Sequence, residues 1–519
     1  MSDSQKLPFS LAMNINTRDE TTGEVLQEIQ NKPFCIAMMG NFSGRQGVTE
    51  TSIGDRNFIP IDRYNYDEVL ASMGLVLSLK LDRESDNTVD VELHSLKDFH
   101  PDNLYKNVAV FGQLRDLRNR LNNRETFAEA MKEFGLQSEQ DDTPEQLVSA
   151  TSKEIQPPSS VEQSVEASGI SLLDSIMSET EGQPKYRADS AQSDSHPVQG
   201  KALVDDLIQK LVAGRRKSAS RDPRQDELVA SVDEEITQQM RNLLHHPQFQ
   251  ALEATWRAVH FMVKRIRGNE VKLYLLDVNQ TELESDLAID DVTQTQLYIQ
   301  FCDTSVGDIN WSLIVGDYQF RPDIDDILQL SQLGLIAQQA GAQFISAADE
   351  KLVGCNSFAE TPKADKWLFN VGEPVQEAWA LLRKSPVAKN ISLSLPRVML
   401  RVPYGIKDTP VKAFAFEELS DPPKHAEYLW GNPAFIKAEQ IARAFTKSGW
   451  DLQYANVMNT DDLPVHYYEE GGRTIVKPCA EISLTDTGAS KMVAQGLIPL
   501  WSVKNSDRVH SGDFHSIAE

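Results

Sequence analysis

A polar, acidic stretch divides this 519-residue sequence into two blocks whose apolar residues are patterned like those of folded protein. Residues 137–200 contain 12 Asp and Glu residues against 3 Lys and Arg residues, together with many Ser and Gln residues. A segment of this composition buries too little apolar surface to offset the entropy lost on ordering. We therefore predict two folded parts, residues 1–135 and 201–519, joined by an acidic flexible linker over residues 136–200.

The charge of the chain limits the classes of partner that it can bind. It has 51 Lys and Arg residues and 77 Asp and Glu residues, so its formal net charge is −26 at pH 7. Nucleic-acid binding needs a basic surface, which this composition disfavours. The first residues lack the apolar core of a secretory signal, and no apolar run has the length of a membrane span. We expect a cytoplasmic protein with no nucleic-acid partner and no membrane insertion.

The apolar patterns predict a layered α/β fold. Pro33–Met39 is a continuous apolar run, which is typical of a buried strand, and Leu11–Ile15 alternates like a strand that has no neighbouring partner. The other predicted strands are Val76–Leu81, Val89–Leu93, Lys272–Leu276, Trp311–Gly316, Gln343–Ala347 and Ile391–Leu395. The predicted helices are Asp67–Gly74, Leu104–Leu121, Ile324–Ala340 and Ala434–Phe445, with two or three more between Leu203 and Arg267.

The motifs that suggest catalysis or ligand binding are incomplete. Gly40–Gly47 follows a buried strand, but Arg45 and Gln46 stand where a phosphate-binding Walker loop needs Lys and Ser or Thr, so a structural turn is favoured. The adjacent His245 and His246 cannot chelate one metal ion as residues one helical turn apart do. No Gly-x-Ser-x-Gly nucleophile elbow is present. We expect no catalytic residue, cofactor or metal.

Two arginines are candidates for protein–protein contacts. Arg397 and Arg401 flank a run between a predicted strand and a predicted turn. Because arginine forks to carboxylates, and because an acidic chain that self-assembles needs cations facing acidic patches, both are predicted interface residues. An ion pair within their own domain is an equally favoured alternative. The sequence gives no positive support to a different function, that of an enzyme whose turnover depends on Arg397 or Asp317.

Two apolar segments are further interface candidates. Leu11, Met13 and Ile15 lie on one face of the isolated predicted strand. In the linker, Leu173, Ile176 and Met177 lie on one face of a short amphipathic helix predicted over residues 170–177. A short amphipathic helix in a polar stretch either binds a partner or docks on its own domain.

Several motifs occur here in the order in which they occur in a known pair of subunits. The first block contains Gly40–Arg45, Asp62–Leu70 and Leu96–Asp102. The second contains His245–Glu253 with Trp256, Gly316–Tyr318, Leu395–Arg397 with Arg401, Pro403–Gly405 and Tyr428–Asn432. The blocks resemble the small and large subunits of the contractile sheath of the bacterial type VI secretion system, fused in one chain. The resemblance covers about residues 1–135 and about residues 165–519.

This resemblance implies a structural role, with two intimately paired halves forming a sheath-subunit fold. In the family, small and large subunits pair tightly, and the pairs stack in helical rings around an inner tube. Strands donated from extended arms tie neighbours together, and Leu11–Ile15 fits such an arm. The implied partners are the chain itself or standard sheath subunits, with the inner tube, a baseplate or an AAA+ unfoldase as further partners. The predicted helix over residues 170–177 is the nearest candidate for the unfoldase-binding helix.

The second block departs from the family pattern at its end. The sequence stops soon after Leu500, whereas large sheath subunits continue with further helices and a strand-donating arm. We therefore expect a C-terminally shortened large-subunit part. The alternative function is that of a non-contractile, sheath-derived adaptor that links the sheath end or the baseplate to another component.

Overall fold

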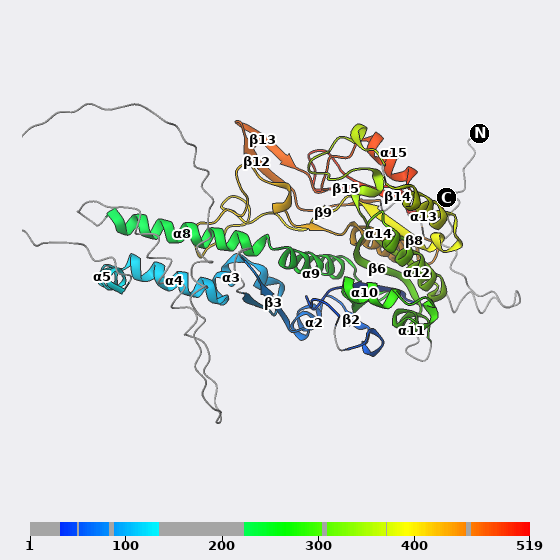
Figure 1. Cartoon of the computed structure of the whole chain (residues 1–519), viewed down its shortest axis with the longest axis horizontal. Helices are drawn as coiled ribbons and strands as arrows, with labels where there is room; N and C mark the ends of the chain where they lie inside the picture. The colour runs from blue at the N-terminus through cyan, green and yellow to red at the C-terminus, as the bar shows by residue number, and fades with distance from the viewer. Residues whose placement is uncertain are drawn as a thin grey trace, which may run out of the picture. The chain divides into compact units, whose positions relative to one another are not determined.

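The computed structural model describes residues 32–48, 51–81, 88–133, 223–303, 309–369, 371–452 and 458–519 (Figure 1). They form two compact units. Unit 1 takes its described residues from Met1–Leu77, Val91–Asn103 and Leu243–Glu519, and unit 2 takes them from Ser78–Asp90 and Leu104–Asn242. Unit 1 therefore contains residues of both sequence blocks.

A nine-stranded mixed sheet forms the centre of unit 1, in the order β11-β15-β14-β8-β7-β6-β1-β5-β2. The six strands from β14 to β5 in this order run parallel, whereas β2, β15 and β11 are antiparallel to their neighbours. In sheet order the strands are β11 (Asn459–Thr460), β15 (Val509–Ser511), β14 (Leu497–Ser502), β8 (Ile391–Leu395), β7 (Gln343–Ala348), β6 (Trp311–Phe320), β1 (Phe34–Gly40), β5 (Val271–Asp277) and β2 (Ile59–Ile61).

Strand β1 comes from the first sequence block and lies between two strands of the second. Its register places Ile36 beside Leu273 of β5 and beside Leu313 of β6. All seven residues of β1 are buried, as expected for a parallel strand covered on both faces. The first block thus supplies an interior strand of the sheet.

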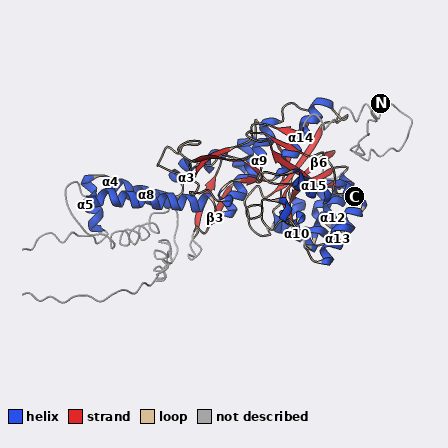
Figure 2. Cartoon of the chain, turned by 90° about the horizontal axis from the view of Figure 1, so that it is seen from above, coloured by secondary structure: helices blue, strands red, loops and turns tan. Residues whose placement is uncertain are grey.

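Helices cover both faces of this sheet. In Figure 2, α14 lies on one side of the strands, and α12 and α13 lie on the other. Twelve of the 16 residues of α14 are buried, so it is an interior helix. The helices of unit 1 are α2 (Tyr66–Ser72), α9 (Pro247–Arg265), α10 (Gln280–Leu287), α11 (Gln296–Cys302), α12 (Ile324–Ala340), α13 (Glu373–Lys384), α14 (Pro433–Ser448) and α15 (Asp486–Ala494).

Unit 2 is largely helical in its described residues. Helix α4 (Ala109–Asn122) and helix α8 (Pro223–Leu244), most of which belongs to unit 2, lie side by side in both views (Figures 1 and 2). The ion pair between Arg118 and Asp233 joins them, and Gln225 Nε2 donates to the Leu121 carbonyl oxygen at 2.7 Å. The remaining helices are α3 (Pro101–Asn107) and α5 (Arg124–Glu133). Two small two-stranded sheets belong to unit 1, namely β9 (Val398–Met399) with β10 (Trp430–Gly431), and β12 (His466–Glu470) with β13 (Arg473–Lys477). A further two-stranded sheet consists of β3 (Leu75–Leu79) and β4 (Val89–Leu93).

The predicted mixed α/β class is confirmed, and most predicted elements lie within a few residues of their observed bounds. The single helix predicted over Leu104–Leu121 is wrong. Val108 has extended backbone angles (φ −80°, ψ 130°), which end α3 and begin α4. The helical repeat continues across this break because Val108 itself is buried. The predicted strand Leu11–Ile15, the linker 136–200 and the helix over residues 170–177 lie outside the described residues. In the described part of the chain, no helix combines the length and apolarity needed to cross a membrane.

The interior position of β1 predicts a large loss of stability when one of its side chains is truncated. Ile36 is fully buried, so Ile36→Ala should lower the free energy of unfolding by about 2–5 kcal/mol in urea denaturation. Ile406 is 67% exposed, and Ile406→Ala removes the same atoms with little effect. Similar losses for both variants would contradict the burial of β1.

Candidate functional site

The glycine-rich loop after β1 binds a carboxylate of the second block. The backbone N–H groups of Phe42 and Ser43 donate to Asp277 Oδ1 at 2.8 and 3.1 Å, and Arg45 pairs with Asp277 Oδ2. Asp277 ends β5, the strand beside β1. A phosphate-binding loop offers its backbone N–H donors to a bound phosphate. In this loop the same kind of donor binds the carboxylate of Asp277, which belongs to the chain itself. These contacts are those of a structural turn.

One glycine of this loop is required by its backbone. Gly44 has φ +70°, a conformation that other residues adopt at a cost. A Cβ atom there would also lie 3.0 Å from Leu77 Cδ2 and 3.1 Å from Leu252 Cδ2. The loop can approach helix α9 this closely because the position has no side chain.

A buried ion pair lies beside the loop and again joins the two blocks. The Arg56 guanidinium donates to both carboxylate oxygens of Glu282, at 2.8 and 2.6 Å. The two side chains are only 9% and 5% exposed. Glu282 also accepts from the backbone N–H of Asn279, the residue that caps α10. Arg56 thereby fixes the start of α10 against the first block.

Trp256 of α9 brings three of the family motifs together. Its indole Nε1 donates to the Phe42 carbonyl oxygen at 2.9 Å, and the Tyr66 hydroxyl donates to the Trp256 carbonyl oxygen at 2.9 Å. Phe42 belongs to the glycine-rich motif and Tyr66 to the Asp62–Leu70 motif. We call the contacts of Asp277, Glu282 and Trp256 with the first block the seam.

Arg401 lies in a second buried network next to the seam. It donates to Glu253 at 2.8 Å and to Glu418 at 2.7 Å, and its guanidinium carbon lies 4.2 Å from the centre of the Tyr404 ring. Burial alone would raise the pKa of Glu418. The charge of Arg401 and the hydrogen bonds to Glu418 outweigh this effect and lower that pKa to about 2. Arg257 also pairs with Glu253, so the network is electrically balanced.

Arg397 lies in a separate network. Its Nε donates to Glu481 Oε2 at 3.1 Å, and His425 Nε2 lies 2.9 Å from Glu481 Oε1. Lys477 Nζ is 3.1 Å from the other ring nitrogen of His425. Burial opposes ionisation of Glu481, but His425 and Arg397 lower its pKa to about 2.

Both predicted arginines therefore have carboxylate partners within unit 1. The ion pair within the domain, the alternative kept open from the sequence, is present for each. Arg401 is 7% exposed and its donors are occupied, whereas the Arg397 side chain is 36% exposed. Contact of either arginine with a neighbouring subunit stays a prediction. The other candidates, Leu11, Met13, Ile15, Leu173, Ile176 and Met177, lie outside the described residues.

Asp317, named in the enzyme hypothesis, has the surroundings of a structural group. The Thr255 hydroxyl donates to Asp317 Oδ2 at 2.5 Å, and burial raises the pKa of Asp317. Of the two adjacent histidines, His246 serves backbone geometry, since its Nδ1 accepts from the Gln248 N–H at the start of α9, and His245 Nε2 lies 3.7 Å from Glu418 Oε1. No group of three or more His, Cys, Asp or Glu side chains suited to a metal ion occurs in the described ranges.

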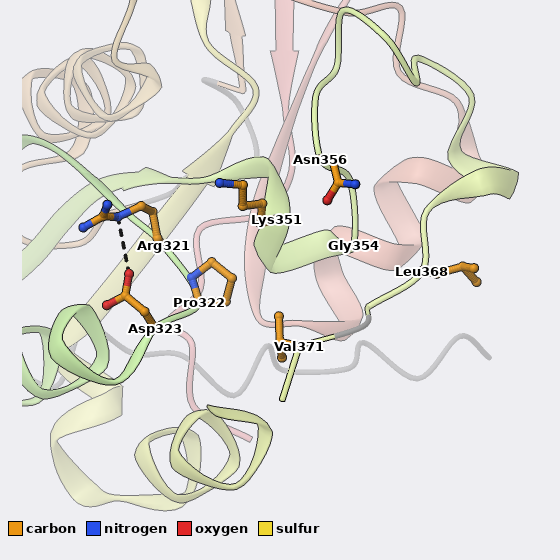
Figure 3. A pocket seen from close by; sticks show the side chains of 8 residues that line it. All are labelled: Arg321, Pro322, Asp323, Lys351, Gly354, Asn356, Leu368 and Val371. Carbon is orange, nitrogen blue, oxygen red and sulfur yellow. Dashed lines mark ion pairs between the residues drawn. The ribbon is translucent and has the colours of Figure 1, made fainter. Parts of the chain in front are cut away.

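A hollow of about 360 Å³ lies at the carboxyl ends of β6 and β7, where open α/β sheets bind ligands (Figure 3). Its charged lining residues are Arg321, Asp323 and Lys351. Figure 3 shows Arg321 paired with Asp323, and Arg321 also pairs with the buried Asp326. Its lining contains no nucleophile with a neighbouring base, so it offers no catalytic constellation.

Sequence reasoning placed Phe42, Arg45, Tyr66 and Trp256 of the seam in quoted motifs, but it missed Arg56, Asp277 and Glu282. Asp277 is 232 positions from its partner Arg45, and in the neighbouring network Arg401 is 148 positions from Glu253. Arg56 and Glu282 lie in no motif. Their pairing had no signal in a single sequence, because it depends on how β1 aligns with β5.

Comparisons with known proteins connect both blocks to one secretion machine. Residues 226–517 match the family described as EvpB/VC_A0108, tail sheath N-terminal domain, and residues 13–140 match the family described as Type VI secretion system, VipA, VC_A0107 or Hcp2. Over 296 residues the chain is 30% identical to the type VI secretion system sheath protein TssC1 of Pseudomonas aeruginosa. The matched region is 54% of this chain and 59% of TssC1. Over 99 residues it is 26% identical to the type VI secretion system sheath protein TssB1 of the same organism. This matched region is 18% of the chain and 58% of TssB1. The chain thus spans about three fifths of each of these relatives.

The buried Arg56–Glu282 pair predicts a substitution effect that a surface pair lacks. Arg56→Met removes the buried cation that pairs with Glu282, which should cost about 3–5 kcal/mol of unfolding free energy. Arg508 and Asp461 are each 46% exposed, so Arg508→Met should cost less than about 1 kcal/mol. Urea denaturation of both variants measures the difference. A loss for Arg56→Met as small as that of the control would show that the seam pair does not hold the fold.

The lowered pKa values of Glu418 and Glu481 predict loss of stability in acid. An unfolded Glu has a pKa near 4.3, roughly two units above the folded values of about 2. The stabilisation is therefore complete above about pH 5 and is lost as pH falls towards 2, on the order of 3 kcal/mol per group. The urea midpoint should change little between pH 6 and pH 4.5 and should fall clearly between pH 4.5 and pH 3.

Glu481→Gln isolates one of these two groups. It should flatten the decrease between pH 4.5 and pH 3 although it lowers stability at pH 6. Glu373→Gln changes an exposed residue and should leave the pH profile unaltered. Parallel profiles for Glu481→Gln and the unsubstituted chain would contradict the assignment.

Proposed function

This chain belongs to the tail-sheath family of the type VI secretion system and joins a small-subunit part to a large-subunit part, and on that premise we propose that it is a structural sheath-type subunit. It stacks around a contractile tube, or caps one, in the cytoplasm. The observation that supports this role most is the position of β1 between β5 and β6. A chain whose two parts share one sheet is a ready-made building block with fixed one-to-one stoichiometry.

The chemistry of the described residues supports assembly over catalysis. Sheath proteins of these families are structural. The buried ionisable groups of the seam and of the network beside it are engaged with one another: Arg56 with Glu282 in the seam, and Arg401 with Glu253 and Glu418 beside it. A carboxylate that an arginine keeps ionised is a weak base near neutral pH, far from the pKa that a general acid or base needs. We propose that the protein has no enzymatic role.

Self-association is the proposed mode of action. The hairpin of β12 and β13 pairs with no third strand among the described residues, and an open strand edge is a template for β-augmentation. The alternating segment Leu11–Ile15 is the proposed donated strand, from another copy or from a standard sheath subunit. Further proposed partners are the inner tube, the baseplate, and an AAA+ unfoldase that binds Leu173, Ile176 and Met177.

Electron microscopy of the purified chain tests this function. We expect rings, stacked discs or tubes, formed alone or after addition of standard sheath subunits. Size-exclusion chromatography should give a corresponding high-mass fraction. A single-copy species that ignores sheath subunits would contradict the proposal. Small oligomers that bind only a non-sheath component would favour the adaptor instead.

A matched pair of variants tests the donated strand. Leu11→Asp with Ile15→Asp places two charges on the apolar face of the segment, and Ser10→Asp with Asn14→Asp places two charges on its polar face. Because the side chains of a strand alternate between faces, only the first variant should reduce assembly. Equal assembly of both variants would remove this strand from the proposal.

A further inference from the structure

The two arginines predicted to meet acidic neighbours are paired internally, but a different set of cations is available on unit 1. A hollow of about 430 Å³ lies beside the last turns of α9. Five of its 13 lining residues are Lys or Arg, and two are acidic, Glu439 and Asp462. We call this hollow the basic pocket. Its cations are Arg257, Lys264, Arg265, Arg267 and Arg443. In a chain with net charge −26, such an excess of positive charge is a local exception.

Three of these cations are held by their own unit. Arg257 donates to Glu253 at 2.7 Å, and Arg443 pairs with Glu439 at 3.2 Å. Arg265 donates to the Asp461 carbonyl oxygen and lies 4.7 Å from the centre of the Phe261 ring. They give the pocket a fixed, positively charged lining.

Lys264 and Arg267 differ from the other three. Both are exposed, and neither makes an ion pair or a side-chain hydrogen bond with another described residue. The favourable field at the C-terminus of α9 accounts for the charge of Lys264, which lies in its last turn. It does not account for Arg267, which follows the helix, or for Arg443, which comes from α14. Cations from separate elements thus converge on one hollow.

Apart from His260, the rest of the lining is apolar. It comes from Phe261 of α9, from Met399 and Leu400 at β9, and from Leu463 and Pro464 of the segment before β12. A free phosphate ion would make no favourable contact with these apolar side chains. A peptide that carries both carboxylates and aliphatic side chains matches both parts of the lining.

We propose that the basic pocket binds the acidic segment 159–181 of a second copy of this chain. This segment contains five acidic residues and no Lys, Arg or His. Its acidic residues are Glu162, Glu166, Asp174, Glu179 and Glu181, and they are interspersed with Val, Ile, Leu and Met residues. The inference rests on the proposed self-association, because it assigns the occupant to a neighbouring copy.

The tether before the segment sets how far it reaches from its own copy. The 25 residues between Glu133 and Ser159 can span at most ~85 Å when extended. Exposed ion pairs are individually weak. The segment therefore binds through several pairs at once together with burial of its aliphatic side chains, and the contact weakens with salt.

Peptide binding tests the pocket directly. The receptor is the full chain with Glu162→Gln, Glu166→Gln, Asp174→Asn, Glu179→Gln and Glu181→Gln, so that its own segment does not compete. The probe is a fluorescent peptide of residues 159–181, followed by anisotropy. We expect saturable binding that weakens at least tenfold after Lys264→Glu with Arg267→Glu. Binding should also weaken between 0.05 and 0.3 M salt, a range over which the Debye length (~10 Å at 0.1 M) shortens about 2.4-fold.

The matched control reverses two exposed cations outside the pocket, in Lys366→Glu with Arg63→Glu. This receptor has the same net charge as the pocket variant and should bind the peptide normally. Equal weakening in both receptors, or equal binding of a peptide whose five acidic residues are neutralised, overturns the proposal.

Crosslinking identifies the copy that supplies the segment. A photo-crosslinking amino acid replaces Leu400, and two differently tagged copies of the otherwise unchanged chain are mixed before irradiation. Crosslinks from the pocket to residues 159–181 of the other copy are expected, and crosslinks only within one copy overturn the assignment. Particles without peptide binding contradict the pocket and leave the sheath function standing. Peptide binding by a chain that never associates contradicts the sheath function.

Discussion

Backbone pairing of β1 with β5 and β6 is the constraint on which the rest of unit 1 depends. A strand between two parallel neighbours satisfies its backbone groups on both sides, and β1 does so entirely with partners from the other sequence block. The register of these pairs brings Gly40 beside Asp277. The loop after β1 can therefore cradle the Asp277 carboxylate, and Arg56 can reach Glu282.

The charge distribution follows from the same arrangement. The chain has 26 more acidic than basic residues, and burial of unpaired carboxylates would oppose folding. In the seam and beside it, Glu253, Glu282 and Glu418 each have an arginine partner. Buried ion pairs add little net stability, but a packing that separates them leaves charges uncompensated. They therefore penalise alternative ways of joining the two blocks.

Local patterns predicted the elements well, and they did not predict the sheet. The apolar run Pro33–Met39 and the helical repeat of Ile324–Ala340 correspond to β1 and α12 because burial and periodicity are written in adjacent residues. Strand order has no such local signature. Likewise, the forked chemistry of Arg401 was predictable from its residue type, whereas its partners Glu253 and Glu418 come from segments that only the fold brings together. The break at Val108 was missed because its buried side chain continues the apolar repeat across two helices.

The interior position of β1 also has a consequence for the order of events during synthesis. Phe34 and its partner Val271 are 237 positions apart, and Cys35 and its partner Trp311 are 276 positions apart. At ~5–20 residues per second, β1 waits on the order of 10–50 s for both neighbours. Throughout that time the seven residues of β1, all buried in the folded protein, lack the two strands with which they pair. Because this strand is shared by both blocks, the nascent chain depends on protection of β1 from aggregation until the second block has been synthesised.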